Sequence, residues 1–446
     1  MSETPSSSSI STKQAWIAKL ARDMRGQALT SLSQHIDLDW LKEAYRRTRK
    51  DGAVGVDGQT AAEYGRDLEA NLTSLLNRAK SGTYRAPPVR RVHIPKGSGG
   101  ATRPIGIPTF EDKVLQRAVA MIVGEVYEQD FLDCSFGFRP GRSQHMALES
   151  FWTQAMAMGG GTVVEVDVKS FFDAIDHGRL REILRQRVRD GVILRLIGKW
   201  LKAGVLEEGR VTHPDSGTPQ GGVISPLLAN VFLHEVLDTW FESEVQPRLR
   251  GRGFLVRFAD DFVMCFAHEE DANRVLAVVD KRFAKYGLTV HPDKTRLVSF
   301  RRPPRQGGGH GPTGTEPPGT LNLLGFTHYW GRSRRGYWVI KRRTMSSRLS
   351  RSLRAVWTWC KANRHRPLAE QHRQLVRKLR GHYAYYGITG NGPQICAFRH
   401  WAYVIWRKWL NRRSRHTRGG LAGLDRRLAR YPLPNATVVH SVFRRS

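Results

Sequence analysis

The segment GTVVEVDVKSFFDAIDH, which spans Gly161 to His177, places an acidic residue inside an apolar run. Four valines surround Asp167, and such β-branched residues are typical of a buried strand. A carboxylate is costly to bury unless it is paired or bound to a metal ion. After Phe171 and Phe172 the pattern becomes helical. We therefore interpret Asp167 as a functional residue that is carried by a core strand.

A second acidic segment is FLVRFADDFVMCF, which spans Phe254 to Phe266. Apolar residues flank Asp260 and Asp261, and this pattern predicts a hairpin with both acids at the turn between two hydrophobic strands. Side chains alternate along a strand, so the two carboxylates point the same way only if a turn or bulge intervenes. Taken alone, an Asp-Asp pair is also typical of a solvated turn.

Together the two segments predict two or three carboxylates on adjacent core strands. Like charges this close raise each other's pKa, and a divalent cation removes the conflict. Mg²⁺ prefers carboxylate oxygens, water and substrate phosphates, with Mn²⁺ as a possible substitute. Two such ions about 3.5–4 Å apart stabilise the attacking and leaving oxygens of an in-line phosphoryl displacement. The expected attacking group is a primer 3′-hydroxyl, and the leaving group is pyrophosphate.

The composition indicates a polyanionic partner. Of the 446 residues, 72 are Lys or Arg and 40 are Asp or Glu, which gives a formal net charge of +32. Nucleic acid is favoured over an anionic membrane, because no uninterrupted apolar run is long enough to span a bilayer. The N-terminus lacks a secretory pattern, and none of the four cysteines forms a Cys-x-x-Cys pair. We expect neither disulfides nor structural zinc, and this cysteine usage fits a reducing cytoplasm.

The charge is concentrated at one end. From Gly331 to Ser446 there are 28 Lys and Arg but only two acids. A Pro- and Gly-rich linker, Arg301 to Gly319, and a short apolar strand, LNLLGF, precede this part. Apolar residues then recur at helical spacing, with Arg on the opposite faces, which predicts amphipathic helices whose basic faces suit a phosphate backbone.

Several further blocks occur in a fixed order, and together they carry a family resemblance. RFADDF is similar to the Y/F-x-D-D signature of reverse transcriptases, and VDVKSFFDAIDH resembles their first palm motif. The other blocks are DGAVGVDGQT, IPKGSGGATRPIGIPT, FGFRPGRSQHMAL, GTPQGGVISPLLANVFLH, GLTVHPDKT, LNLLGF and RGHYAYYGITGN. From about residue 35 to about 440 the chain resembles the bacterial reverse transcriptase/maturases that group II introns encode.

The resemblance implies an α+β right-hand polymerase fold. The fingers and the palm, which has an antiparallel sheet, precede an α-helical thumb or maturase domain. The implied divisions are a disordered Ser-rich leader over 1–34, an N-terminal extension over 35–80, fingers and palm over 81–330, a helical domain over 331–430 and a basic tail over 431–446.

The resemblance also assigns the catalytic residues. Asp167 and Asp260 are the implied metal ligands, Asp261 is a supporting carboxylate, and the carbonyl of Val168 joins them. Phe172 stands where the family has an aromatic steric gate that rejects a 2′-hydroxyl; the alternative is a core phenylalanine.

Further residues are implied to contact substrates. Lys96 and Arg103 bind the incoming triphosphate, Gln220 touches the nascent base pair or the nucleotide, and Lys294 supports the palm or the triphosphate. Gly221 and Gly222 allow the backbone to approach the templating pair. Arg139 and Arg142 hold the template backbone, with structural salt bridges as an equally good interpretation.

Two departures from the family pattern matter. Phe258 replaces the usual tyrosine, which keeps the ring and the metal ligands. The paired cysteines of a C-terminal endonuclease segment do not occur, so we expect no intrinsic cleavage of DNA.

The implied activity is an RNA-directed DNA polymerase that copies its intron RNA and assists splicing and mobility. Its partners are group II intron RNA, an RNA template with a DNA primer, deoxynucleoside triphosphates and target DNA. Two alternatives stay open: a domesticated reverse transcriptase in a defence or CRISPR-linked system, and a splicing-only maturase.

Overall fold

The computed structural model describes residues 7–95, 102–207, 209–212, 217, 221–304, 319–413 and 420–441. The chain divides into two compact units. Unit 1 comprises Met1–Ala147 and Val164–Leu297, and unit 2 comprises Leu148–Val163 and Val298–Ser446. Within the described ranges, no helix has the length and apolar character needed to cross a membrane. The four cysteines, all described, are free thiols.

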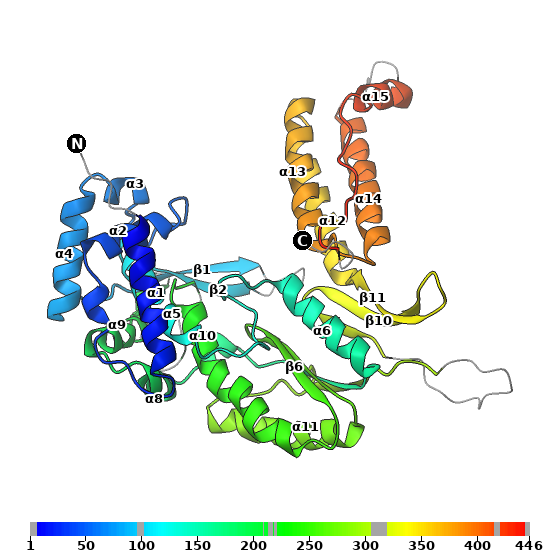
Figure 1. Ribbon diagram of the computed structural model, residues 1–446. Helices are drawn as coiled ribbons and strands as arrows, with labels where there is room; N and C mark the ends of the chain where they lie inside the picture. The colour runs from blue at the N-terminus through cyan, green and yellow to red at the C-terminus, as the bar shows by residue number, and fades with distance from the viewer. Residues whose placement is uncertain are drawn as a thin grey trace. The chain divides into compact units, whose positions relative to one another are not determined.

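Unit 1 is built from helices around one large hydrophobic core (Figure 1). The helices are α1 (Ser7–Asp23), α2 (Leu38–Arg47), α3 (Ala61–Tyr64), α4 (Leu68–Ser81), α5 (Phe110–Tyr127), α7 (Phe171–Ala174), α8 (His177–Arg187), α9 (Gly191–Leu201), α10 (Ser225–Leu233) and α11 (Glu269–Lys285). Helix α5 is buried along most of its length, and Trp40 of α2 donates a hydrogen bond from Nε1 to the Ala118 carbonyl at 2.9 Å. Helix α10 continues into π-helical turns at His234–Thr239 and Phe241–Val245.

Two four-stranded sheets accompany these helices. The first has the order β2-β1-β4-β5, with β1 (Val89–Pro95), β2 (Thr102–Ile107), β4 (Val205–Glu207) and β5 (Arg210–Thr212). The second has the order β6-β7-β3-β8, with β6 (Gly253–Phe258), β7 (Asp261–Phe266), β3 (Thr162–Val166) and β8 (Arg296–Ser299). The chain passes between the two units within β3 and near the start of β8.

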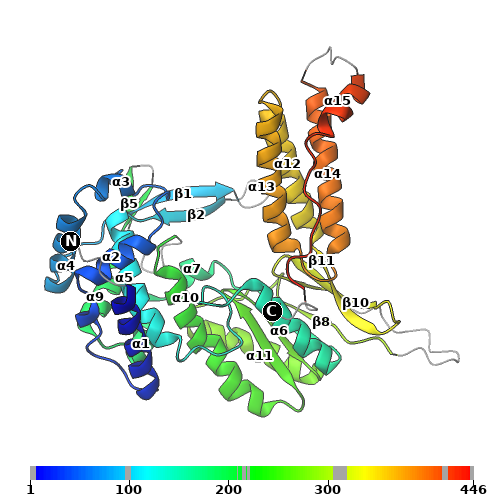
Figure 2. The same ribbon diagram turned by 45° about the horizontal axis from the view of Figure 1, so that its top comes forward.

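Unit 2 combines a small sheet with a helical bundle that has its own core (Figure 2). The strands lie in the order β11-β10-β9 and are β9 (Leu321–Leu323), β10 (Phe326–Arg332) and β11 (Trp338–Thr344). The helices are α12 (Ser346–Asn363), α13 (Leu368–Tyr386), α14 (Gly392–Asn411), α15 (Gly420–Leu428) and most of α6 (Gln144–Met158). Trp152 of α6 donates from Nε1 to the Ile340 carbonyl at 2.9 Å.

The predicted elements agree well with these boundaries. The mixed α+β class is confirmed, as are the hairpin around the Asp-Asp pair, the strand before Asp167 and the helices after residue 345. The 35–80 region is helical, with the expected loop at 51–60 between α2 and α3.

The expected disordered leader is wrong for Ser7–Asp23, which forms α1. Ile10, Ile17 and Ala21 are buried at spacings of seven and four residues, so they form an apolar stripe in the core. Part of the segment 431–441 is also packed: Leu433 is buried, and Val439 donates to the Gly387 carbonyl at 2.7 Å.

Candidate active site

The Asp-Asp pair lies at the turn of the β6–β7 hairpin. Phe258 pairs with Asp261, so only Ala259 and Asp260 lie between the strands. Ala259 has φ +56°, a left-handed conformation that costs a residue with a side chain about 1–2 kcal/mol. Asp260 is half-buried and Asp261 is exposed at the first position of β7. The surroundings of the turn must therefore stabilise its backbone.

Two neighbours hold this turn. Arg257 donates from Nη1 to the Ala259 carbonyl at 3.2 Å. Gly137 packs against the turn so closely that an added Cβ would lie 2.3 Å from the Ala259 nitrogen and 2.9 Å from the Phe258 carbonyl carbon. Position 137 therefore requires glycine, because any side chain would displace the turn that carries Asp260.

Arg257 is the centre of a buried polar network. Its side chain and that of Asp238 are both fully buried, and they form a bidentate pair with N···O distances of 2.7 and 2.6 Å. The guanidinium also donates to Asn230 Oδ1 at 2.9 Å and to Ser135 Oγ at 2.7 Å. With the Ala259 carbonyl, these bonds use all five N–H groups of the arginine. Sequence reasoning did not identify this network.

The network also reaches Gly137. Asn230 donates from Nδ2 to the Gly137 carbonyl at 2.6 Å, while its Oδ1 accepts from Arg257. Asp238 lies in the π-helical turn that continues α10, and such turns are frequent at functional sites. These hydrogen bonds thus join strand β6 with helix α10, its π-helical continuation and Gly137.

Asp167 directly follows β3, which lies beside β7 in the sheet. Its carbonyl accepts from the His291 backbone at 2.7 Å, and the buried Val168 forms an antiparallel bridge with Val290. The Asp167 carboxylate pairs with the Lys294 ammonium at 3.0 Å, and both side chains are about half exposed. The three acidic residues therefore belong to neighbouring strands of one sheet.

The donor set is suitable for Mg²⁺. In the described ranges, no group of three or more His, Cys, Asp and Glu side chains is arranged to hold a metal ion. Magnesium is commonly bound through one or two carboxylates, with water and substrate phosphates as the other ligands. The Asp167 carboxylate already attracts one cation, the Lys294 ammonium. Asp167 and the acids of the hairpin thus fit an ion that the substrate completes.

Asp173 links Phe172, its neighbour in the chain, with Arg103, whose charge acts on the Asp173 carboxyl. Phe172 is half-buried in α7, packs against the core of unit 1 and meets Phe171 edge to face at 5.4 Å between ring centroids. Burial raises the pKa of the Asp173 carboxyl, and the charges of Arg91 and Arg103 act in the opposite direction. Strands β1 and β2 therefore bring two guanidinium groups towards the residue that follows the candidate steric gate.

The glycines near residue 220 fit closely against other backbone segments. Gly221 has φ +114°, and a Cβ there would lie 2.5 Å from the Gly106 carbonyl oxygen of β2. Gly217 donates to the Ile175 carbonyl at 2.8 Å, and a Cβ there would lie 3.0 Å from the Asp173 Cα. Gly222 is buried. Gly221 thus lies against β2 and Gly217 against α7, while Lys96 and Gln220 lie outside the described residues.

The two arginines expected at the template differ in their surroundings. Arg139 is buried, pairs with Glu128 at 3.0 Å and donates to the carbonyls of Leu132 and Ser135. It has the structural role that the sequence left open. Arg142 pairs with the exposed Asp133 at 2.6 Å, which leaves its predicted template contact as a prediction.

Comparison with known proteins identifies relatives of this chain. Residues 94–328, about half of the chain, match the family described as "Reverse transcriptase (RNA-dependent DNA polymerase)". The chain is 36% identical over 260 residues to protein YkfC of Escherichia coli, which covers 51% of this chain and 67% of YkfC. It is 45% identical over 169 residues to the group II intron-encoded protein LtrA of Lactococcus lactis, which covers 38% of this chain and 28% of LtrA.

Proposed function

Because this chain belongs to the reverse transcriptase (RNA-dependent DNA polymerase) family and is related to group II intron reverse transcriptases, we propose that it copies intron RNA into DNA and also binds that RNA to assist splicing and mobility. The observation that carries the polymerase part is the position of the acids: Asp167 follows β3, Asp260 lies in the turn before the neighbouring β7, and Asp261 begins β7.

In this proposal Asp167 and Asp260 are the principal Mg²⁺ ligands, with Asp261 and the Val168 carbonyl in support. When bound, two Mg²⁺ ions, or Mn²⁺ in their place, supply charge stabilisation for the primer 3′-hydroxyl and the departing pyrophosphate. The chain's part is to hold the carboxylates still. Arg257 and Gly137 fix the turn of Asp260, and the 288–294 segment holds the backbone of Asp167.

The incoming deoxynucleoside triphosphate is proposed to lie between β2 and α7. Arg103, with Lys96, contacts the phosphates, because guanidinium and ammonium groups suit phosphate oxygens. Phe172 excludes a 2′-hydroxyl through its ring, and Gln220 contacts the nascent pair. Support for this placement comes from the electrostatic coupling of Asp173 with Arg91 and Arg103.

The splicing part rests on charge and relatedness. Residues 331–446 carry 28 Lys and Arg against two acids, which favours binding to a structured RNA. The match covers only 28% of the intron-encoded protein LtrA, so a splicing role of the whole protein stays within this proposal.

A primer-extension assay tests the proposal. Wild type, Asp260→Asn and the exposed Asp67→Asn extend a DNA primer on an RNA template with Mg²⁺. We expect Asp260→Asn to lose several orders of magnitude in rate, because one ligand charge is removed, while Asp67→Asn keeps the wild-type rate. Splicing of the intron by Asp260→Asn should be largely retained. Extension by Asp260→Asn at the wild-type rate would refute the catalytic assignment.

A further inference from the structure

A basic hollow lies in unit 1, and none of its lining residues belongs to the acidic site. It has a volume of about 890 Å³ and is lined by residues of α8, α9, β5 and the 84–88 and 202–204 segments. The six cations around it are Arg85, Arg181, Arg185, Arg195, Lys199 and Lys202. Among the described lining residues there is no Asp or Glu. We call this feature the basic hollow.

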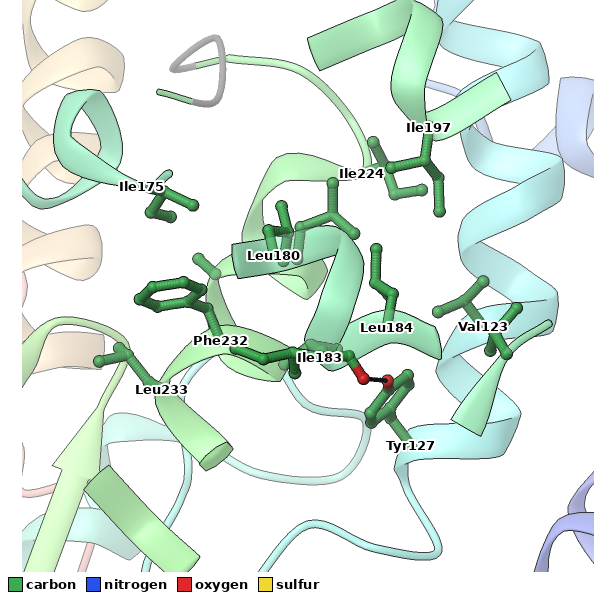
Figure 3. Close-up of a cluster of buried hydrophobic side chains, with 14 of the residues drawn as sticks. Val123, Tyr127, Ile175, Leu180, Ile183, Leu184, Ile197, Ile224, Phe232 and Leu233 are labelled. Carbon is green, nitrogen blue, oxygen red and sulfur yellow. Dashed lines mark hydrogen bonds between the residues drawn. The ribbon is translucent and has the colours of Figure 1, made fainter. Parts of the chain in front are cut away.

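The amphipathic character of α8 explains two of the six cations. Leu180, Ile183 and Leu184 face the core of unit 1, where the Tyr127 hydroxyl meets the Ile183 carbonyl (Figure 3). Residues four apart lie on the same face of a helix. Arg181 and Arg185 therefore share one face, and they line the hollow.

Helix α9 supplies a second basic stripe. Its buried side chains include Ile193, Ile197 and Trp200, so it turns this face to the core. Arg195 and Lys199 are four residues apart and again share a face that borders the hollow. The two helices thus direct their cations towards one cavity.

Two of the cations build the wall of the hollow. Lys199 donates from Nζ to the Gly82 carbonyl at 2.7 Å, and Arg195 donates from Nη2 to the Lys80 carbonyl at 3.2 Å. These bonds fix the chain that leads from α4 to β1. Neither bond neutralises charge, because both acceptors are backbone carbonyls.

Within the described residues, the other three arginines of the hollow, Arg85, Arg181 and Arg185, have no ion-pair partner. Arg181 Nε is buried and has no hydrogen-bond partner in the described part of the chain. Like charges four residues apart on a helix repel each other, so Arg181 and Arg185 destabilise α8. A bound anion relieves this repulsion.

The size and the lining of the hollow suit a single strand of nucleic acid. Its volume is within the usual range of about 300–1,000 Å³ for ligand sites. Leu194, Pro88 and the exposed Val211 add apolar surface between the cations. Grooves that bind single strands combine cations along the phosphates with surfaces on which bases pack.

We propose that the basic hollow binds the phosphate backbone of single-stranded RNA at a site separate from Asp167, Asp260 and Asp261. The proposal rests on the family's use of an RNA template and not on a splicing role. The basic hollow would then be a second RNA contact of the polymerase, which raises the affinity for the strand without taking part in the chemistry.

The test uses the full chain and two matched double variants. Arg85→Glu/Arg185→Glu reverses two exposed cations of the hollow, and Arg25→Glu/Lys281→Glu makes the same change of net charge at exposed positions elsewhere in unit 1. Anisotropy of a labelled single-stranded RNA 12-mer gives Kd over a series of salt concentrations. Thermal melts confirm that both variants are folded.

We expect the hollow variant to weaken RNA binding at least tenfold and the control less than threefold. The slope of log K against log salt should fall by about 1.4, since each phosphate contact to a single strand contributes about 0.7. In primer extension, KM for the template should rise while kcat is kept, which separates this result from a failure of the catalytic proposal.

Three results would overturn the proposal. Equal losses in both double variants would mean that only the overall charge matters. An unchanged salt slope in the hollow variant would mean that no phosphate is bound there. Displacement of the RNA 12-mer by micromolar ATP or pyrophosphate, abolished in the hollow variant, would mean that the hollow takes a free nucleotide.

Discussion

Separating Arg257 from Asp238 should test how the chain fixes its catalytic turn. Asp238→Ala leaves a fully buried guanidinium without its carboxylate, because both partners have no exposed side-chain surface. Removing one partner of such a pair typically costs about 3–5 kcal/mol, a large part of a usual folding free energy of about 5–15 kcal/mol. We expect a loss of this size in urea unfolding followed by tryptophan fluorescence.

A surface pair provides the control for stability. Arg179 and Glu182 form an ion pair at 3.2 Å, but their side chains are 52% and 64% exposed. Exposed pairs of this kind contribute about 0–1 kcal/mol. Glu182→Ala should therefore change the unfolding free energy far less than Asp238→Ala.

A double variant separates stability from positioning. Replacing both partners with apolar residues, as in Arg257→Met/Asp238→Leu, removes the uncompensated charge, and such exchanges are often neutral or stabilising. The Ala259 carbonyl still loses the donor at 3.2 Å. A displacement of reacting groups by about 1 Å can cost about 100-fold in rate, so we expect a folded protein with at least tenfold slower primer extension.

Two outcomes would refute this reasoning. A folded double variant that extends primers at the wild-type rate would mean that Arg257 does not position the turn. A loss of unfolding free energy below about 1 kcal/mol for Asp238→Ala, equal to that of the surface control, would also refute it. The Arg257 guanidinium would then not depend on Asp238 to offset its burial.

Three further predictions follow from the same structure. Gly137→Ala should slow primer extension at least tenfold, because its Cβ would lie 2.3 Å from the Ala259 nitrogen. The control Gly124→Ala, whose Cβ would meet nothing within 4 Å, should keep the wild-type rate. Equal rates of the two variants would contradict this prediction. Phe172→Ala should raise incorporation of ribonucleotides relative to deoxynucleotides, measured as the ratio of kcat/KM values, and an unchanged ratio would favour the core-residue interpretation. Burial raises the pKa of Asp112 to about 7 from 3.8. Between these two pH values the native state holds a proton that the unfolded state lacks, so the unfolding free energy should fall as pH rises. Over the whole range the fall is on the order of 4 kcal/mol. Urea titrations at pH 5 and pH 8 cover about two of these pH units, so they should show a fall on the order of 3 kcal/mol in wild type and a much smaller one in Asp112→Asn.

The sequence predicts those parts of the site whose signal is local. Apolar residues on both sides of the Asp-Asp pair are sufficient for a hairpin, because the two strands are adjacent in the chain. The strand of Asp167 is likewise visible as an apolar run. The predicted adjacency of the two segments is confirmed by the sheet order, although nearly 100 residues separate β3 from β7 and no local signal relates them.

The supporting residues could not be predicted in the same way. Arg257 is a lone charge in the apolar run FLVRF, which is the same kind of signal that identifies Asp167, but the sequence does not indicate what it pairs with. Its partners Asn230 and Asp238 lie 27 and 19 residues away on another element, and no sequence period relates them. Similarly, the serines at the start of α1 concealed a stripe of buried residues whose partner, α5, lies about 90 residues later.

The discontinuous course of the chain has a consequence for evolution and for engineering. Leu148–Val163 belongs to unit 2, although unit 1 flanks it on both sides in the sequence. Within unit 2, the fully buried Phe151 packs against Phe300 and His328. Cutting the chain after Leu297 would separate Phe151 from Phe300 and His328 and would leave the apolar face of α6 exposed. A single crossover therefore cannot exchange the C-terminal unit between relatives. A chimera needs two further junctions, after Ala147 and after Val163, and both lie ahead of Asp167.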